Sequence, residues 1–93
     1  MPLRFAWDAR KAAANMRKHG VSFSEAATAF ADLQSITIPD PDHSAEEDRF
    51  VLIGRTRNQL LVIVAHVERG ATTRIISARP AGRRERRMYE EGE

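Results

Sequence analysis

The spacing of apolar residues changes once along the chain. Between residues 9 and 30, apolar side chains recur every third or fourth position, which predicts helices with one buried face. From residue 36 onward they alternate with polar residues or form short apolar runs, which predicts strands. Short polar links separate consecutive runs, which favours an antiparallel meander. The pattern predicts an α+β fold: a small antiparallel β-sheet with N-terminal helices packed on one face and a C-terminal helix.

Capping residues give the bounds of the first two helices. Asp8 is a suitable N-cap for a helix that Gly20 ends. Ser22 followed by Glu25 is a capping-box pattern, which opens a second helix. In the first helix, the predicted buried stripe consists of Ala9, Ala12, Ala13 and Met16.

The remaining elements follow from the same pattern. Strands are predicted at residues 3–7, 35–38, 49–56, 60–68 and 73–79, and a polar helix at 83–91. The strand LLVIVAHVE at 60–68 is apolar on both faces, as a central strand requires. The loop PDPDHSAEED at 39–48 contains two prolines and five acidic residues, which oppose regular structure.

Strict alternation along the strands sorts the arginines by face. On the strand that begins at Arg49, one face would carry Arg49, Val51, Ile53, Arg55 and Arg57. On the last strand, Thr73, Ile75, Ser77 and Arg79 would share a face, opposite Arg74, Ile76 and Ala78. Both strands would flank the central strand, so their arginines are expected to gather beside one groove, at a register that the sequence leaves open.

The composition indicates one small intracellular domain. The 93 residues contain no cysteine, which excludes a disulfide framework and a zinc–thiolate site. No apolar run approaches the roughly 20 residues that span a bilayer. The opening MPLRFAWDARK lacks the apolar core of a signal peptide. We expect a single domain, residues 1–93, that is cytoplasmic and makes no membrane contact.

The net charge of +2 conceals an asymmetry between the two halves. Residues 1–48 carry five Lys and Arg against eight Asp and Glu, whereas residues 49–93 carry ten Arg against five Glu. The planar fork of donors on Arg matches a phosphate group, and its guanidinium stacks on bases. The basic second half therefore favours a polyanionic partner.

An arginine groove would suit the cleavage of RNA without a metal. That reaction needs a base for the 2′-hydroxyl proton, a cation beside the phosphate and an acid for the leaving oxygen. The candidate acids and bases are His43, Glu47, His66 and Tyr89. Structural roles compete with each: His66 fits a core residue on a central strand, and the loop that carries His43 and Glu47 fits a solvated segment.

A metal site is an alternative for the acidic loop. Carboxylate oxygens suit Mg²⁺ or Mn²⁺. The possible ligands are Asp40, Asp42, His43, Glu46, Glu47 and Asp48. Their spacing matches no defined metal loop, so we expect neither a metal nor another cofactor.

The last predicted helix, RRERRMYEE, concentrates basic residues. Arg83 and Arg87 lie four residues apart on one face, and Glu85 and Glu90 provide some pairing within the helix. Its surface fits RNA binding or the docking of an acidic partner, and the sequence leaves both open.

Three separated blocks follow a known pattern. FAWDARKAAANMRKHGVSFSEAATAF matches an opening of an aromatic residue, WD, a lysine and N-x-x-KHGV-x-F-x-EA. IPDPDHSAEEDRFVLIGRT matches D-x-x-H-x-x-x-E-x-R-x-x-x-x-G, and RIISARPAGRRERRMYEEG matches R-I-I-S-A-R-x-A-x-x-x-E-R-x-x-Y. The blocks are collinear and cover nearly the whole chain, which therefore resembles the BrnT family of type II toxin–antitoxin toxins.

This resemblance implies a fold, an activity and a partner. BrnT-type toxins have a RelE-like fold and are ribonucleases that arrest translation by degrading RNA. A BrnA-like antitoxin, which is a ribbon-helix-helix DNA-binding protein, neutralises them in a heterotetramer built on an antitoxin dimer. Operator DNA is then bound only through the antitoxin, and RNA is the expected substrate of this chain.

The resemblance also selects residues. The matched motif positions are Lys18, His19, His43, Glu47, Arg49, Ser77, Arg79, Glu85 and Tyr89. We expect Arg49 and Arg79 to hold the scissile phosphate, with His43 or Glu47 as the proton acceptor. Expected RNA contacts are Lys18, His19, Arg55, Arg83 and Tyr89. Pro80 departs from the basic residue usual in the family, and His66 gains no support from it.

Other functions are compatible with the same features. The chain would be a non-enzymatic nucleic-acid-binding module if its basic groove only binds RNA. It would instead poison a protein such as gyrase if it follows other members of the wider RelE/ParE superfamily. An antitoxin-like structural protein is the third alternative.

Overall fold

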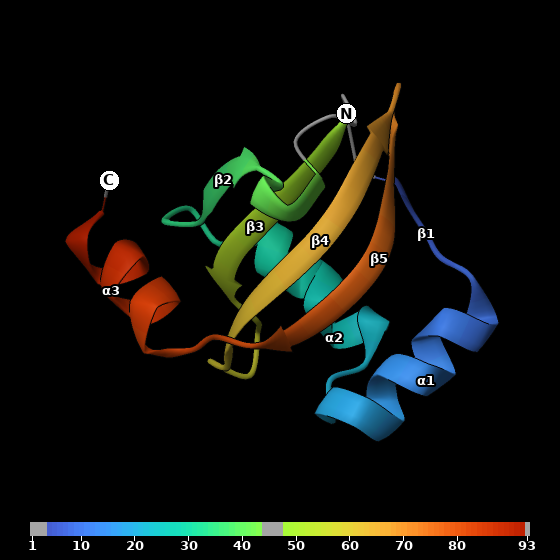
Figure 1. The fold of residues 1–93 in the computed structure, drawn as a ribbon, viewed down its shortest axis with the longest axis horizontal. Coiled ribbons are helices and arrows are strands. Elements are labelled where there is room, and N and C mark those ends of the chain that lie inside the picture. The colour runs from blue at the N-terminus through green and yellow to red at the C-terminus, as the bar shows by residue number, and fades with distance from the viewer. Residues whose placement is uncertain (1–3, 44–47, 93) are drawn as a thin grey trace.

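The protein is built on a five-stranded sheet with the strand order β1-β5-β4-β3-β2 (Figure 1). A computed structural model describes residues 4–43 and 48–92. The strands are β1 (Arg4–Ala6), β2 (Ile36–Pro39), β3 (Arg49–Arg55), β4 (Leu61–Arg69) and β5 (Thr72–Pro80). The helices are α1 (Ala9–His19), α2 (Phe23–Thr28) and α3 (Arg83–Glu91), with the 3₁₀ turns η1 (Ala29–Ala31) and η2 (Pro41–His43). The α+β class is confirmed, and the predicted strand bounds are right to within one residue.

The sheet is mixed, which corrects the prediction of a wholly antiparallel one. Strands β2 to β5 form the expected antiparallel meander, whereas β1 pairs in parallel with β5. A short link forces antiparallel pairing only between strands that follow each other along the chain. Strands β1 and β5 are joined through both helices and three other strands, so this constraint does not act on them. The parallel position lets Phe5 pack against Phe30, with ring centroids 5.1 Å apart.

Two apolar cores lie on opposite faces of the sheet. The core on the α1 and α2 side contains Val21, Phe23, Ala26, Leu52, Val62, Val64, Ile75 and Ala78. The smaller core on the α3 side contains Ile53, Leu61, Ile63 and Tyr89. Figure 1 shows α2 behind the strands and α3 well separated from α1. None of the helices in the described ranges is long and apolar enough to cross a membrane.

The predicted capping residues fix both ends of α1. The Asp8 carboxylate accepts hydrogen bonds from the N–H groups of Arg10 and Lys11, at 2.8 and 3.1 Å. Gly20 ends the helix with φ of 72°, a conformation that glycine adopts without steric cost. In α2, Ser22 Oγ accepts from the Glu25 N–H at 3.0 Å, also as the capping pattern predicts.

Of the predicted apolar stripe of α1, Ala12 packs against the core, and the other three residues do not. Met16 is 51% exposed and both Ala9 and Ala13 are exposed, whereas Asn15 is only 7% exposed. The helix packs against β5, where it meets backbone N–H and C=O groups as well as apolar side chains. A polar side chain is favoured at that contact because buried backbone groups need hydrogen-bond partners.

Asn15 completes the edge of β5. Strand β1 pairs only with Thr72 to Arg74, so the backbone of Ala78 lies beyond its end. The Asn15 side-chain amide accepts from the Ala78 N–H at 3.1 Å and donates to the Ala78 carbonyl oxygen at 2.8 Å. It also donates to the Val21 carbonyl oxygen at 3.0 Å, which ties the segment after α1 to the same point. One side chain thus replaces a missing strand neighbour.

A β-bulge in β5 overturns the predicted faces of that strand. Ser77 pairs with Ala65 and Ile75 pairs with His66, so Ile76 is an extra residue between two paired positions. An extra residue reverses the alternation of side chains from that point onward. Ile75 and Ala78 therefore lie in the same core, whereas Ser77 and Arg79 face the other side of the sheet. The prediction that Thr73, Ile75, Ser77 and Arg79 share a face is wrong.

Replacing Asn15 by alanine should destabilise the protein by about 3 kcal/mol. The change removes three hydrogen bonds and leaves buried backbone groups of Ala78 and Val21 without them, and each such group costs about 1–3 kcal/mol before relaxation. Chemical denaturation measures the free energy of unfolding. Asn58→Ala, at an exposed turn position, is the matched control and should change it by less than about 0.5 kcal/mol. Equal effects of the two changes would contradict the role assigned to Asn15.

Candidate active site

A cavity of about 610 Å³ lies on the α3 side of the sheet. Its size is within the range of about 300–1,000 Å³ typical of ligand sites. The apolar floor consists of Val51, Ile53, Ile63 and Ala65 from β3 and β4. Charged and polar side chains surround this floor, and they are Asp40, Asp42, His43, Arg49, Ser77, Arg79, Arg84 and Glu85. The cavity therefore combines an apolar surface with cations and carboxylates of the same chain.

Arg49 enters the cavity from the start of β3. Its Nε donates to Asp40 Oδ2 at 3.3 Å. The other oxygen of Asp40 accepts from the Asp42 N–H at 3.0 Å, which fixes the carboxylate at the start of η2. Asp40 is itself buried, so its charge is compensated by the Arg49 guanidinium and by a backbone donor. This pair orients Arg49 along one side of the cavity.

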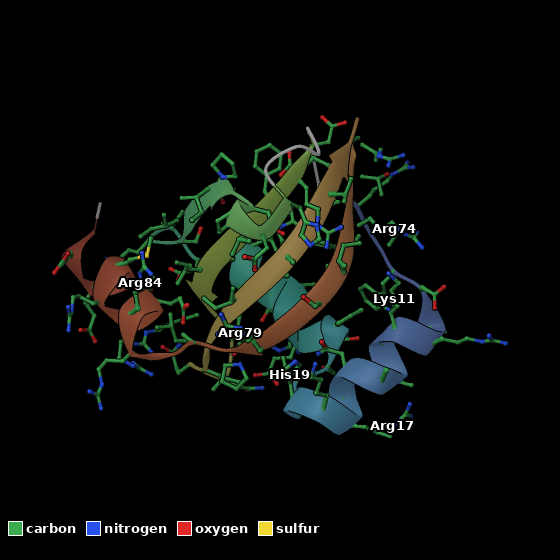
Figure 2. All side chains as sticks on the ribbon, in the orientation of Figure 1. Lys11, Arg17, His19, Arg74, Arg79 and Arg84 are labelled. Carbon is green, nitrogen blue, oxygen red and sulfur yellow. The ribbon has the colours of Figure 1, made fainter. Side chains whose placement is uncertain are left out.

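Arg79 enters from the opposite end, near the end of β5 (Figure 2). Its guanidinium faces the Glu85 carboxylate, with Nη1–Oε1 at 3.4 Å and Nη2–Oε2 at 3.3 Å. Glu85 Oε1 also accepts from the Gly82 N–H at 2.7 Å, which caps α3. The hydrogen bonds from Arg79 lower the pKa of the Glu85 carboxyl; partial burial opposes them, and the Gly82 N–H reinforces them. Glu85 thus joins the first turn of α3 to the cavity.

The structure brings three of the four predicted catalytic residues to one cavity. Arg49 and Arg79 lie on the strands that flank β4, opposite Val67 and Ile63 respectively, and His43 lines the same space from η2. The two positions on β4 are four residues apart, or about 13 Å of strand. The two guanidinium groups therefore approach the cavity from its two ends. Glu47 lies outside the described residues.

Arg55 and Tyr89 lie elsewhere, beside a second cavity of about 670 Å³. The Tyr89 hydroxyl donates to Asp32 Oδ2 at 2.7 Å, and the Arg55 N–H donates to the same oxygen at 2.8 Å. The Arg55 guanidinium carbon lies 5.5 Å from the centroid of the Tyr89 ring. Tyr89 is buried against the sheet. Through Asp32, these hydrogen bonds connect α3 to β3 and to the turn after η1.

Electrostatics of this network follow from the same contacts. Burial raises the pKa of the Tyr89 hydroxyl, and the hydrogen bond to the Asp32 carboxylate raises it further. Burial alone would raise the pKa of Asp32, but hydrogen bonds from Arg55 and Tyr89 outweigh it and lower that pKa from 3.8. Tyr89 is therefore a poor proton donor near neutral pH.

The other predicted RNA contacts lie at helix ends. Lys18 is exposed and His19 half-buried in the last turn of α1, and Arg83 is exposed at the start of α3. Figure 2 shows His19 on α1 and Arg84 on α3, on either side of Arg79 in that view. Their role in binding RNA stays a prediction.

Sequence reasoning placed Arg74 on the wrong face. Arg74 pairs with Val67, which also pairs with Arg49, so all three side chains lie on one face in a single row across the sheet. In Figure 2 its side chain extends toward β1 and α1, on the same side as Lys11. N–H groups of Lys11 and Arg10 lower the pKa of Asp8, and the charges of Arg74 and Lys11 add to this effect. The bulge in β5 causes this difference, because no local pattern of apolar and polar residues predicts it.

His66 lies on the opposite face from the cavity. It is fully buried, with its ring centroid 4.9 Å from that of Phe30 and 6.1 Å from that of Phe50. Its Nδ1 lies 3.2 Å from the Val64 carbonyl oxygen, and its Nε2 lies 3.3 Å from Glu68 Oε2. These contacts agree with the core role that its position on a central strand favours.

No metal site is found among residues 4–43 and 48–92. Within these ranges no three His, Asp or Glu side chains lie close enough together to hold a metal ion. Glu46 and Glu47, two of the possible ligands in the acidic loop, lie outside the described residues.

The fold and the cavity define a small α+β protein with a cavity lined by arginines and carboxylates. Comparison with known proteins identifies the family of this chain. A sequence model described as "Ribonuclease toxin, BrnT, of type II toxin-antitoxin system" matches residues 7–85. The chain belongs to the BrnT family of ribonuclease toxins.

A solved structure supports this assignment. The crystal structure of the Brucella abortus ribonuclease toxin, BrnT, is similar to this chain with a TM-score of 0.71 and 25% sequence identity. The similarity covers 88% of this chain and 100% of the Brucella chain. A comparison with curated protein sequences gave no match.

Tyr89→Phe should lower the free energy of unfolding by about 1–2 kcal/mol at pH 7, because it removes a hydrogen bond to a carboxylate. Since the pKa of Asp32 is lowered from 3.8, its ionised form stabilises the fold above that pH and this contribution is lost on acidification. The difference between wild type and variant should therefore be constant from pH 5 to 8 and shrink below about pH 3.8. Denaturation at several pH values measures it.

The same variant tests whether Tyr89 contacts RNA. Its hydroxyl is committed to Asp32, so the KM for an RNA substrate should stay within about twofold of wild type. A large rise in KM with unchanged stability would show that the hydroxyl binds RNA instead.

Proposed function

We propose that the chain cleaves RNA in the cavity beneath α3, without a metal, by attack of a 2′-hydroxyl on the adjacent phosphorus. The observation that carries this proposal is the meeting of Arg49, Arg79 and His43 at one cavity. The BrnT family assignment supports ribonuclease activity in general, and the cavity supplies a site for it.

Arg49 and Arg79 bind the scissile phosphate in this proposal. Negative charge on the phosphoryl oxygens grows as the 2′-oxygen attacks, and donors held in place beforehand stabilise that charge without reorganisation. Asp40 and Glu85 orient the two guanidinium groups in the free protein. The apolar floor limits access of water to one side of the phosphate and so strengthens these interactions.

Two proton transfers complete the reaction. The 2′-hydroxyl loses a proton to a base, and the departing 5′-oxygen receives one from an acid. The products are a 2′,3′-cyclic phosphate and a 5′-hydroxyl. His43 lies at the cavity and is suited to one of these transfers, and Glu47 is the other candidate from the same loop.

Exposed basic residues contact the flanking RNA. Arg83, Arg86 and Arg87 are exposed within the first five residues of α3, while Glu90 and Glu91 lie in its last turn. Arginines in the first half of a helix and glutamates in its last turn oppose the helix dipole. This order of charges suits a polyanion near Arg84, which lines the cavity. Lys18, His19 and Arg55 are assigned to the same role.

The proposal includes a protein partner. Membership in a type II toxin–antitoxin family implies a protein antitoxin. We assign to it a BrnA-like ribbon-helix-helix protein, bound in a heterotetramer built on the antitoxin dimer, through which operator DNA is contacted. A RelE-like fold and inhibition of translation by RNA degradation belong to the same proposal.

Arg79→Ala and Arg49→Ala should each lower kcat for RNA cleavage by about 100- to 1,000-fold, because each removes one preorganised donor to the transition state. Cleavage of a labelled oligoribonucleotide in the presence of EDTA is the measurement. Arg69→Ala, an exposed residue at the end of β4, is the matched control and should cleave at the wild-type rate.

Two outcomes would contradict the proposal. Wild-type protein that binds RNA but leaves it intact would favour a non-enzymatic module. Growth arrest in cells without loss of labelled RNA would favour a toxin that acts on a protein such as gyrase.

A further inference from the structure

We infer that Glu85, on the first turn of α3, is the general base that accepts the proton of the substrate's 2′-hydroxyl. The inference rests on the proposed function and names a catalytic residue for it. It assigns the role expected for His43 or Glu47 to a carboxylate at the other end of the cavity, beside Arg79.

Glu85 is placed where a base is needed. Its carboxylate lines the cavity and is held on the guanidinium of Arg79, the proposed phosphate ligand. In an RNA chain, the attacking 2′-hydroxyl is on the sugar next to the scissile phosphate. A phosphate bound to Arg79 therefore brings that hydroxyl close to the Glu85 carboxylate.

Arg79 can hold both groups at once. Its three described hydrogen bonds go from Nη1 to the Pro80 carbonyl oxygen and Glu85 Oε1, and from Nη2 to Glu85 Oε2. A guanidinium has five N–H donors, so its Nε–H and one Nη2–H remain for a phosphate oxygen among these described contacts. The Arg79 side chain is 44% exposed, which leaves that edge accessible.

Substrate binding activates this base. In the free protein, hydrogen bonds from Arg79 lower the pKa of the Glu85 carboxyl, which makes it a weak base. A bound phosphate shares the positive charge of Arg79 and adds a negative charge beside Glu85. Both changes raise the pKa of Glu85 toward the working pH, so the base becomes effective when RNA is in place.

Asp40, another carboxylate of the cavity, is less suitable. The Asp40 side chain is 7% exposed, against 25% for Glu85. Asp40 is therefore enclosed and positions Arg49. Tyr89 is bound to Asp32 at the second cavity. Among the described acidic side chains at the cavity, Glu85 combines exposure with contact to a phosphate ligand.

The proton balance of the step is complete. Glu85 takes the proton from the 2′-hydroxyl, the 2′-oxygen forms a bond to phosphorus, and the bond from phosphorus to the 5′-oxygen breaks. His43, which also lines the cavity, donates a proton to the departing oxygen. RNA is thereby converted to a 2′,3′-cyclic phosphate and a 5′-hydroxyl, with no other reactant.

Glu85→Gln is the informative variant. Glutamine keeps a carbonyl oxygen that can accept from the Gly82 N–H and from Arg79, so the cap of α3 is preserved while the base is lost. We expect kcat to fall by at least about 100-fold, with KM within about threefold of wild type. Glu91→Gln, exposed at the end of α3, is the matched control and should keep the wild-type kcat.

The pH profile separates a base from a positioning residue. Wild-type kcat should fall at acidic pH as Glu85 is protonated, and this acidic limb should be absent from the residual activity of Glu85→Gln. A variant with wild-type kcat, or one whose lowered kcat retains the acidic limb, would overturn the inference. A wild-type protein that leaves RNA intact would overturn the proposed function itself, whereas loss of activity in Arg79→Ala but not Glu85→Gln would leave that function standing.

A measurement on the wild-type chain tests the inference without depending on correct folding of the variant. Carboxyl ¹³C NMR follows the titration of Glu85 with and without a 2′-deoxy oligonucleotide, which carries phosphates but cannot be cleaved. The pKa of Glu85 should rise by about one unit or more when the oligonucleotide is bound. An unchanged titration in the saturated complex would contradict activation by the substrate.

Discussion

The extra residue in β5 determines which side chains of that strand reach the cavity. Ile76 lies between two paired positions, and the alternation of faces reverses there. Ile75 and Ala78 can then both enter the core while Ser77 and Arg79 face α3. Asn15 holds the segment in place, because its amide hydrogen-bonds both backbone groups of Ala78, the residue before Arg79. The position of Arg79 thus depends on backbone pairing on both sides of β5.

Charge compensation explains how arginines can be held ready around an apolar floor. Arg49 is paired with Asp40 and Arg79 with Glu85, so neither guanidinium has to be stabilised by water alone in the free protein. The two pairs differ in exposure: Asp40 is enclosed, whereas Glu85 remains partly open to the cavity. A phosphate can therefore share Arg79 with its carboxylate, which couples binding of the substrate to the basicity of the group beside it.

Local sequence patterns were sufficient to predict the helices and strands and the side of the cavity that β3 forms. Asp8 and Gly20 define α1 because capping depends on a few neighbouring residues, and unbroken alternation in β3 correctly puts Arg49, Val51 and Ile53 on one face. The faces of β5 and the burial of Asn15 depend on partners more than 60 residues away or on another strand, which no local period records. Glu85 was visible as a motif position, but its contact with Arg79 required the turn at Gly82.

The central claim is that RNA phosphates enter the cavity between Arg49 and Arg79. A crystal structure of the chain with a 2′-O-methyl oligoribonucleotide, which resembles RNA but lacks the attacking hydroxyl, tests it most directly. The account predicts a phosphate bound by the Arg79 guanidinium, with Glu85 near the 2′-oxygen of the preceding nucleotide and Arg49 on the other side. An oligonucleotide bound only along the outer face of α3 or α1, with the cavity filled by solvent, would contradict it.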